Sequence, residues 1–191
     1  TQAKKAFLFQ SFSYPVNSHI IEYCLIADAL HHQGVEEIIG IIPWLGYSKQ
    51  DKIFREGEPL SASVIARILQ TTQTTQIISV DLHSPRICEL YHIPLVNIIP
   101  IEIFANYISD YKLPVSLVVS PDAGSRERSQ AIADYLGLPL IKIDKQRNRK
   151  TGEVTVTSLS EDVEDKDLLI FDDLIATGDT AIQVAKNLKD R

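Results

Sequence analysis

The segment LLIFDDLIATGDT, residues 168–180, decides the fold of this chain. Its first four residues form a short apolar run typical of a buried strand, and two adjacent carboxylates, Asp172 and Asp173, follow at once. A loop that contains Gly178 then leads directly into a helical pattern over Thr180–Lys189. A strand, a glycine turn and a helix in this order predict one β–α unit of an α/β sheet.

The same segment has the composition of a binding site for a phosphorylated sugar. Backbone N–H groups at a helix N-terminus bind anions, and the hydroxyls of Thr177 and Thr180 would add to them. Gly178 permits the positive φ that a phosphate-binding loop requires. Asp172 and Asp173 are suited to accept hydrogen bonds from sugar hydroxyls. A capped helix after an ordinary strand, with acidic residues at its favourable end, explains the same residues without a ligand.

Strand-like and helix-like runs alternate along the rest of the chain. We expect strands at 5–10, 37–42, 76–82, 115–120, 138–143, 153–158 and 168–171. We expect helices at 18–31, where Ile21, Cys24 and Leu25 recur at helical spacing, and at 59–70, 101–111, 127–136 and 180–189. This alternation predicts an α/β protein with mainly parallel sheets flanked by helices. We place a domain boundary near Pro100, which gives domains of residues 1–99 and 100–191.

Bulk properties narrow the class of protein. The chain has 191 residues, 45% hydrophobic and 23% charged, with a net charge of -6, which argues against nucleic acid or an anionic membrane as partner. It has no apolar run of the roughly 20 residues that span a bilayer, and no signal-peptide pattern at its start. Cys24 and Cys88 sit in apolar stretches, so we expect buried packing thiols and a cytoplasmic protein.

Two features bear on completeness. The chain begins with Thr1 and contains no methionine, and it stops at Arg191 inside a helical pattern. We expect a fragment of a longer chain. A selenomethionine protein whose modified residues are missing from the sequence is the alternative.

Polar residues follow two other predicted strands. Asp122, in VVSPDAGSRERS, follows the strand 115–120, and a carboxylate there is suited to Mg²⁺. His83, in SVDLHSPR, ends the strand 76–82 and pairs with Asp122 as a candidate metal or phosphate contact, because ligands bind beyond the carboxyl ends of strands. The alternatives are ordinary turn chemistry for Asp122 and a structural role for His83.

Two polar segments are candidates for binding a nucleotide or its phosphates. The first, WLGYSKQDKIFREGEP from Trp44 to Pro59, offers Lys49 and Gln50 to a phosphate and a base. The second, DKQRNRK from Asp144 to Lys150, is the densest basic stretch of an acidic chain, and a mobile loop there would close over phosphates. A solvated connector and a solvated hairpin tip are the alternatives.

Familiar nucleotide motifs are missing from the sequence. GxxxxGK[ST], GxGxxG, the HRD and DFG motifs of protein kinases and the G-x-S-x-G elbow do not occur. An ATP site in this chain would therefore be of an unusual kind.

Taken together, six segments resemble the ribose-phosphate diphosphokinase (PRPP synthetase) family in order and spacing, over nearly the whole chain. IIPWLGYSKQDK resembles the family's nucleotide-binding stretch PYxGYARQDR, and REGEPLSASVIARIL resembles its RxGEPISAK helix. SVDLH, VVSPDAG, the DKQR loop and DDLIATGDT match four further motifs. The resemblance implies two type I phosphoribosyltransferase-like domains related by a pseudo-twofold. It also implies a cytoplasmic transferase that moves the β,γ-diphosphate of ATP to the 1-hydroxyl of ribose 5-phosphate, giving PRPP and AMP.

The resemblance also assigns roles to residues. It implies ATP binding by Lys49, Gln50, Asp51 and His83, and contacts to Mg²⁺ by His83 and Asp122. It implies a flexible catalytic loop with Lys145 and Arg147. It implies that ribose 5-phosphate is bound by Asp172, Asp173, Ala176, Thr177, Gly178, Asp179 and Thr180. Family members form homo-oligomers, commonly dimer-built hexamers, so a symmetric oligomer is expected.

Three positions depart from the family pattern. Lys49 replaces an arginine, which removes a planar bidentate contact, and Ala176 stands where many members have an acid. Asp179 replaces a glycine, and its carboxylate should repel the phosphate of the sugar unless it points away.

Two other functions remain open at this point. One is a non-catalytic homologue that acts as a regulatory subunit. The other, less favoured because of the ATP loop and the additional N-terminal domain, is a nucleobase phosphoribosyltransferase.

Overall fold

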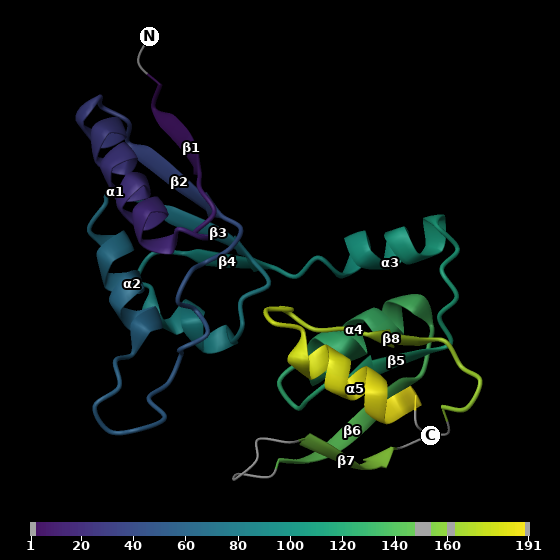
Figure 1. The fold of residues 1–191 in the computed structure, drawn as a ribbon. Helices are drawn as coiled ribbons and strands as arrows, with labels where there is room; N and C mark the ends of the chain where they lie inside the picture. The colour runs from purple at the N-terminus through teal and green to yellow at the C-terminus, as the bar shows by residue number, and fades with distance from the viewer. Residues whose placement is uncertain (1–2, 148–153, 160–162, 190–191) are drawn as a thin grey trace. The chain divides into compact units, whose positions relative to one another are not determined.

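The computed structural model describes residues 3–147, 154–159 and 163–189. The chain divides into two compact units, unit 1 (Thr1–Ile99) and unit 2 (Pro100–Arg191). Each unit contains a four-stranded sheet with helices packed on it, as Figure 1 shows. The expected α/β class with mainly parallel sheets is confirmed.

Unit 1 is built on a parallel sheet whose strands lie in chain order. Its elements are β1 (Lys5–Phe9), α1 (Val16–His32), β2 (Glu37–Ile42), α2 (Ser61–Gln70), β3 (Gln76–Val80), the 3-10 helix η1 (Pro85–Leu90) and β4 (Leu95–Ile98). The sheet order is β1-β2-β3-β4, and α1 and α2 lie on the same face of the sheet (Figure 1). A parallel sheet of this kind directs the carboxyl end of every strand to one edge.

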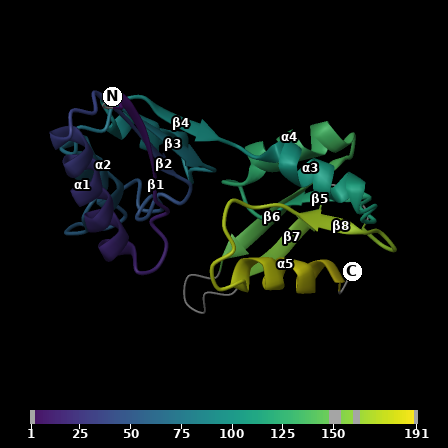
Figure 2. The same cartoon turned by 90° about the horizontal axis from the view of Figure 1, so that it is seen from above.

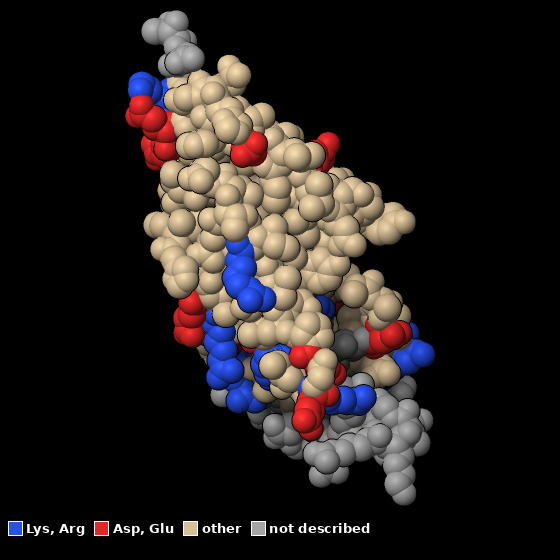
Figure 3. Space-filling model, turned by 90° about the vertical axis from the view of Figure 1, so that its left-hand side faces the viewer, with Lys and Arg blue, Asp and Glu red and all other residues tan. Residues whose placement is uncertain are grey.

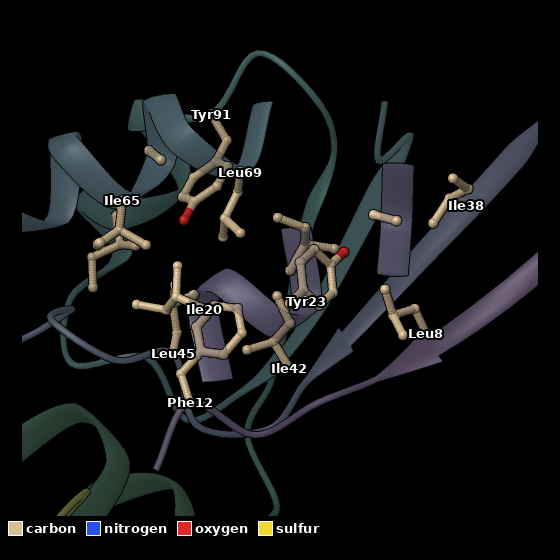
Figure 4. Packing of buried hydrophobic residues seen from close by; sticks show 14 of the residues in the cluster. Leu8, Phe12, Ile20, Tyr23, Ile38, Ile42, Leu45, Ile65, Leu69 and Tyr91 are labelled. Carbon is tan, nitrogen blue, oxygen red and sulfur yellow. The ribbon is translucent and has the colours of Figure 1, made fainter. Parts of the chain in front are cut away.

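The core of unit 1 lies between this sheet and its helices. Apolar side chains from both layers interlock there, among them Leu8, Ile38 and Ile42 from the strands and Ile20, Ile65 and Leu69 from the helices (Figure 4). Tyr23 of α1 is fully buried in this cluster, and its hydroxyl lies 2.9 Å from the hydroxyl of Thr74, just before β3. Thr74 is bonded in turn to Thr72, whose hydroxyl donates to Leu69 O. The network ties α1 to the end of α2.

Unit 2 has three layers. Its elements are α3 (Ile101–Asp110), β5 (Leu117–Ser120), α4 (Arg126–Leu136), β6 (Leu140–Arg147), β7 (Val154–Leu159), β8 (Leu168–Ile170) and α5 (Asp179–Lys189). The sheet order is β7-β6-β5-β8, with β5 parallel to both neighbours and β7 antiparallel to β6. Figure 2 shows α3 and α4 on one side of the sheet and α5 on the other. Ile132 and Val184 belong to separate apolar clusters on the two faces.

Four details of the sequence-based prediction were wrong. The strand β4 and the helix η1 were not predicted, because each is very short and β4 is defined by its pairing with β3. The strand predicted at 138–143 continues to Arg147. Ile21 and Leu25 of α1 are exposed, and the buried positions are Ile20, Tyr23 and Ala27. The two cysteines are free thiols that are only partly buried.

Gly40 on β2 provides a test of how this core is packed. A Cβ atom at residue 40 would lie 2.2 Å from the Tyr23 hydroxyl oxygen and 3.1 Å from Cζ of the same ring. We expect Gly40→Ala to lower the free energy of unfolding by about 1–3 kcal/mol through overpacking. Tyr23→Phe alone should also destabilise, by about 1 kcal/mol, because it removes a buried hydrogen bond.

In the Gly40→Ala background, however, Tyr23→Phe should stabilise the protein, because the hydroxyl is the atom that clashes. Urea unfolding of the four proteins, followed by circular dichroism, measures the sign in each background. If Tyr23→Phe destabilises both backgrounds equally, the close approach of the hydroxyl to β2 is wrong.

Candidate functional site

Three aspartates lie at the carboxyl ends of neighbouring strands in unit 2. Strands β5 and β8 pair in parallel, with Leu117 opposite Leu168 and Val119 opposite Ile170. Asp122 follows β5, and Asp172 and Asp173 follow β8. Because the two strands end at the same edge of the sheet, the register brings the carboxylates of Asp122 and Asp172 close enough to interact electrostatically.

The Asp172 carboxyl is held in a negatively charged, partly buried environment. Burial raises the pKa of Asp172 to about 6, and contact with the side chain of Asp173 and the negative charge of Asp122 add to the rise. One oxygen of Asp172 accepts the N–H of Asp173 at 2.9 Å. Clustered carboxylates whose ionisation is disfavoured in this way would be stabilised by a bound cation.

The donor chemistry of this edge fits Mg²⁺. Mg²⁺ prefers oxygen ligands and is commonly held by one or two carboxylates together with the phosphates of a substrate. Within the described part of the chain, no cluster of three or more histidine, cysteine or acidic side chains is arranged as a complete metal site. The aspartates therefore fit an ion that arrives with a phosphorylated ligand better than a permanently enclosed metal.

The loop between β8 and α5 has the expected glycine geometry. Gly178 has a φ of 82°, in the left-handed region that favours glycine, and its carbonyl accepts the N–H of Ile182 in the first turn of α5. Ala176 and Thr177 are exposed beside it. The backbone of Thr180 lies in the first turn of the helix, so the loop presents its N–H groups where an anion is favoured.

Asp179 does not point away from this loop. The Thr177 hydroxyl donates a hydrogen bond to the Asp179 carboxylate at 2.8 Å, and the Asp179 N–H approaches the same hydroxyl at 3.5 Å. The carboxylate thus engages a hydroxyl that was predicted to bind phosphate. Its charge also remains at the N-terminus of α5, where it interacts favourably with the helix dipole.

Asp122 is held by a closed hydrogen-bonded turn. Oδ1 of Asp122 accepts the N–H of Ser125 at 2.9 Å, and the N–H of Asp122 donates to Ser125 Oγ at 3.2 Å. The hydroxyls of Ser120 and Ser125 both donate to the Asp122 carbonyl, at 2.7 and 3.1 Å. Both serines are buried while Asp122 is exposed. Sequence reasoning missed the two serines, although Asp and Ser side chains that bond to nearby backbone groups are a recognisable local pattern.

The predicted nucleotide segment of unit 1 is anchored to α2. The Gln50 side-chain oxygen accepts the Ser61 hydroxyl at 2.5 Å, and the Gln50 carbonyl accepts the N–H of Ala62 at 3.2 Å. Lys49 is exposed and Asp51 is half-buried beside it. The Gln50 side chain therefore contacts Ser61 through its oxygen and not through its amide nitrogen. Ser61 is a third residue that sequence reasoning missed.

His83 lies in a loop and not at the end of a strand. Strand β3 ends at Val80, and His83 is exposed between it and η1. His83 belongs to unit 1 and Asp122 to unit 2. Their expected contact through Mg²⁺ remains a prediction.

The predicted catalytic loop is in part a strand. The backbone of Lys145 and Arg147 belongs to β6, which pairs with β7 so that Lys145 lies opposite Val156 and Arg147 opposite Val154. A bulge interrupts the pairing between Asp144 and Lys145. The rest of the predicted loop, residues 148–150, lies outside the described residues.

A cavity in unit 1 is poorly suited to these ligands. An apolar cavity of about 320 Å³ lies between α1 and α2 in unit 1, lined mainly by Ile20, Ile21, Val64, Ile65 and Ile68. Figure 3 shows that the surface over these helices carries few charged side chains. The lining of this cavity lacks the cationic and carboxylate groups that a nucleotide or sugar phosphate requires.

None of the helices among the described residues is both long and apolar enough to cross a membrane.

Comparison with known proteins supports the assignment of both halves. Residues 1–72 match the family described as the N-terminal domain of ribose phosphate pyrophosphokinase, and residues 87–191 match the phosphoribosyl transferase domain. The ribose-phosphate pyrophosphokinase of Pyrococcus abyssi is 37% identical over 191 residues, which cover 99% of this chain and 65% of the relative. That of Campylobacter jejuni is 31% identical over 190 residues, which cover 100% and 61%.

A solved structure agrees with these matches. The crystal structure of phosphoribosylpyrophosphate synthetase from Mycobacterium smegmatis superposes with a TM-score of 0.87 at 32% identity, covering 99% of this chain and 61% of that one. The chain therefore spans about three fifths of the length of the relatives that it matches. From its fold, its two domain matches and these relatives, the chain belongs to the ribose-phosphate pyrophosphokinase (PRPP synthetase) family.

Proposed function

We propose that this chain is part of an active ribose-phosphate diphosphokinase, which transfers the β,γ-diphosphate of ATP to the 1-hydroxyl of ribose 5-phosphate and yields PRPP and AMP. The observation that carries the proposal is the placement of Asp122, Asp172 and Asp173 at one edge of the sheet, next to the anion-binding loop before α5. Acceptors for sugar hydroxyls and donors for a phosphate thereby lie on one β–α unit.

The chain's own residues would act mainly by positioning. Asp172 and Asp173 accept hydrogen bonds from the ribose hydroxyls, and backbone N–H groups of residues 176–180 bind the 5-phosphate. Lys49, Gln50 and Asp51 hold ATP, while His83 and Asp122 orient its phosphates. The oxygen of the 1-hydroxyl then attacks the β-phosphorus, the bond from that phosphorus to the bridging α,β-oxygen breaks, and AMP leaves as the hydroxyl proton is lost.

Charge neutralisation would account for most of the rate. Phosphoryl-type transfer requires little covalent assistance from the protein, so in-line positioning and stabilisation of the developing negative charge dominate. Lys145 and Arg147 are proposed to stabilise this charge in the transition state. Bound Mg²⁺ would supply further neutralisation of the ATP phosphates.

Further parts of the proposal come from the family. We propose that units 1 and 2 are two phosphoribosyltransferase-like domains related by a pseudo-twofold, and that the protein is a cytoplasmic homo-oligomer built from dimers. ATP and ribose 5-phosphate are its proposed partners, with Mg²⁺ as cofactor. Nucleic acids and membranes are not proposed as partners, since the net charge is -6.

One observation favours a second candidate, a non-catalytic regulatory homologue. The carboxylate of Asp179 accepts a hydrogen bond from Thr177 within the proposed phosphate loop, which opposes the binding of a sugar phosphate. The aspartates retained at 122, 172 and 173 favour the enzyme. A nucleobase phosphoribosyltransferase is disfavoured by the match of residues 1–72 to the N-terminal domain of the pyrophosphokinase.

The proposed activity is tested by AMP release from ATP, ribose 5-phosphate and Mg²⁺ by the full protein. We expect turnover, and we expect Lys145→Ala to lower kcat by about 100-fold or more while the KM for ATP changes by less than about threefold. Lys186→Ala, on the exposed face of α5, is the charge-matched control. Absence of AMP from the wild-type protein would favour the regulatory homologue, and equal losses in kcat and affinity would contradict a transition-state role.

Asp179 should weaken the binding of ribose 5-phosphate. We expect Asp179→Gly to lower the KM for ribose 5-phosphate by about fivefold, because it removes a like charge beside the phosphate and frees the Thr177 hydroxyl. Asp179→Asn removes the charge but keeps an acceptor for Thr177, so it separates the two contributions. Asp110→Asn, at the end of α3, controls for loss of one negative charge. An unchanged KM in Asp179→Gly would refute the repulsion.

The raised pKa of Asp172 predicts a trade-off between stability and activity. The folded-state pKa is about 6 and the ordinary value is 3.8, so ionisation of Asp172 disfavours the folded state above about pH 6. We expect Asp172→Asn to raise the Tm of the ligand-free protein at pH 7.5 and to abolish most of the activity. The gain in Tm should shrink steadily as the pH falls from about 6 toward 4, because the folded carboxyl is then protonated and the unfolded one approaches its ordinary pKa of 3.8.

Differential scanning calorimetry of both proteins between pH 4 and 8 measures this dependence, with Asp110→Asn as the reference for loss of a surface charge. A gain in Tm that stays constant over this range would show that the charge of Asp172 is not its cause.

A further inference from the structure

Ser125 is a buried serine that forms hydrogen bonds with the exposed residue Asp122. Ser125 is only 2% exposed, and it stands immediately before α4. Neither its burial nor its contacts are required by the helix itself, because the helix cap makes no hydrogen bond through the Ser125 side chain. Its contacts go to Asp122 and Ser120.

The contacts fix Asp122 at three separate groups. The backbone N–H of Ser125 binds Oδ1 of the Asp122 carboxylate, and Ser125 Oγ accepts the Asp122 N–H and donates to the Asp122 carbonyl. Ser120, which is also 2% exposed, donates to the same carbonyl, and its hydroxyl lies 3.2 Å from that of Ser125. Ser125 alone thereby bonds both the main chain and the side chain of Asp122.

This arrangement leaves one carboxylate oxygen available. Oδ1 is engaged by Ser125, whereas Oδ2 of Asp122 has no hydrogen-bond partner among residues 3–147, 154–159 and 163–189. The orientation of the carboxylate also sets its distance to Asp172, whose pKa it helps to raise. A side chain locked by neighbouring hydrogen bonds binds a ligand with less loss of conformational entropy than a free one.

We propose that Ser125 is a positioning residue, which orients the Asp122 carboxylate so that Oδ2 is presented to the magnesium–triphosphate substrate. The inference rests on the proposed function for the role of Asp122, and it adds the residue that holds Asp122 in place. Ser125 touches neither substrate nor ion.

Binding of Mn²⁺ together with α,β-methylene-ATP tests this proposal without turnover. Mn²⁺ replaces Mg²⁺ as an ion visible by electron paramagnetic resonance, and the methylene group prevents cleavage between the α- and β-phosphates. We expect Ser125→Ala in the full protein to raise the Kd of the Mn²⁺–nucleotide complex by about tenfold, at the lower end of the effect of residues that orient a metal ligand. Asp122→Asn should raise it further.

The decisive measurement is the double variant. Once Asp122 is replaced by asparagine, Ser125→Ala should change the Kd by less than about twofold, because the carboxylate that it orients is gone. Ser120→Ala should show the same dependence on Asp122, and it serves if Ser125→Ala folds poorly. Equal losses from Ser125→Ala in both backgrounds would overturn the proposal.

A control separates positioning from general destabilisation. Thr72→Val in unit 1 also removes a buried hydroxyl with two partners, and it lies before β3, at the end of that strand opposite to the proposed ligand edge. It should lower the Tm as Ser125→Ala does, but leave the Kd unchanged. A wild-type protein that binds the Mn²⁺–nucleotide complex but releases no AMP would refute the proposed function and leave the role of Ser125 intact.

Discussion

The parallel pairing of β5 with β8 is the constraint on which the candidate site depends. Each strand is short, and an aspartate stands two residues after the end of each. Parallel alignment sends both carboxyl ends to one edge, so Asp122 and Asp172 meet although 50 positions separate them in the sequence. Antiparallel pairing would place the same residues at opposite ends of the sheet. The buried apolar residues of β5 and the clusters on both faces hold this alignment.

Bringing carboxylates together has an electrostatic cost that the ligand-free fold bears. The partly buried Asp172 beside Asp173 and Asp122 is harder to ionise than an exposed aspartate, which the raised pKa expresses. A cation and sugar hydroxyls would relieve this repulsion, so the arrangement is best understood as prepared for a ligand. Asp179 has a different effect, because its carboxylate is engaged by Thr177 at the loop where a phosphate would bind.

Hydrogen bonds anchor two of the candidate residues, Asp122 and Gln50. In unit 2, the buried hydroxyls of Ser120 and Ser125 hold the turn that carries Asp122. In unit 1, Gln50 is tied to the first turn of α2 by its side chain and its carbonyl. The anchoring residues lie two or three positions from Asp122 and eleven or twelve from Gln50, always within the same unit, so these bonds do not require the other unit.

Sequence alone determined the order of most strands and helices, the acidic and glycine-containing segment after β8 and the family, because apolar periodicity and ordered motifs are local properties. It did not determine which side of α1 is buried, since apolar residues lie around most of that helix and only packing against the sheet selects Ile20, Tyr23 and Ala27. Strand β4 and the extension of β6 to Arg147 likewise depend on pairing partners that periodicity does not reveal. Tertiary structure decided these features because a hydrogen bond or a buried face exists only when two separate segments meet.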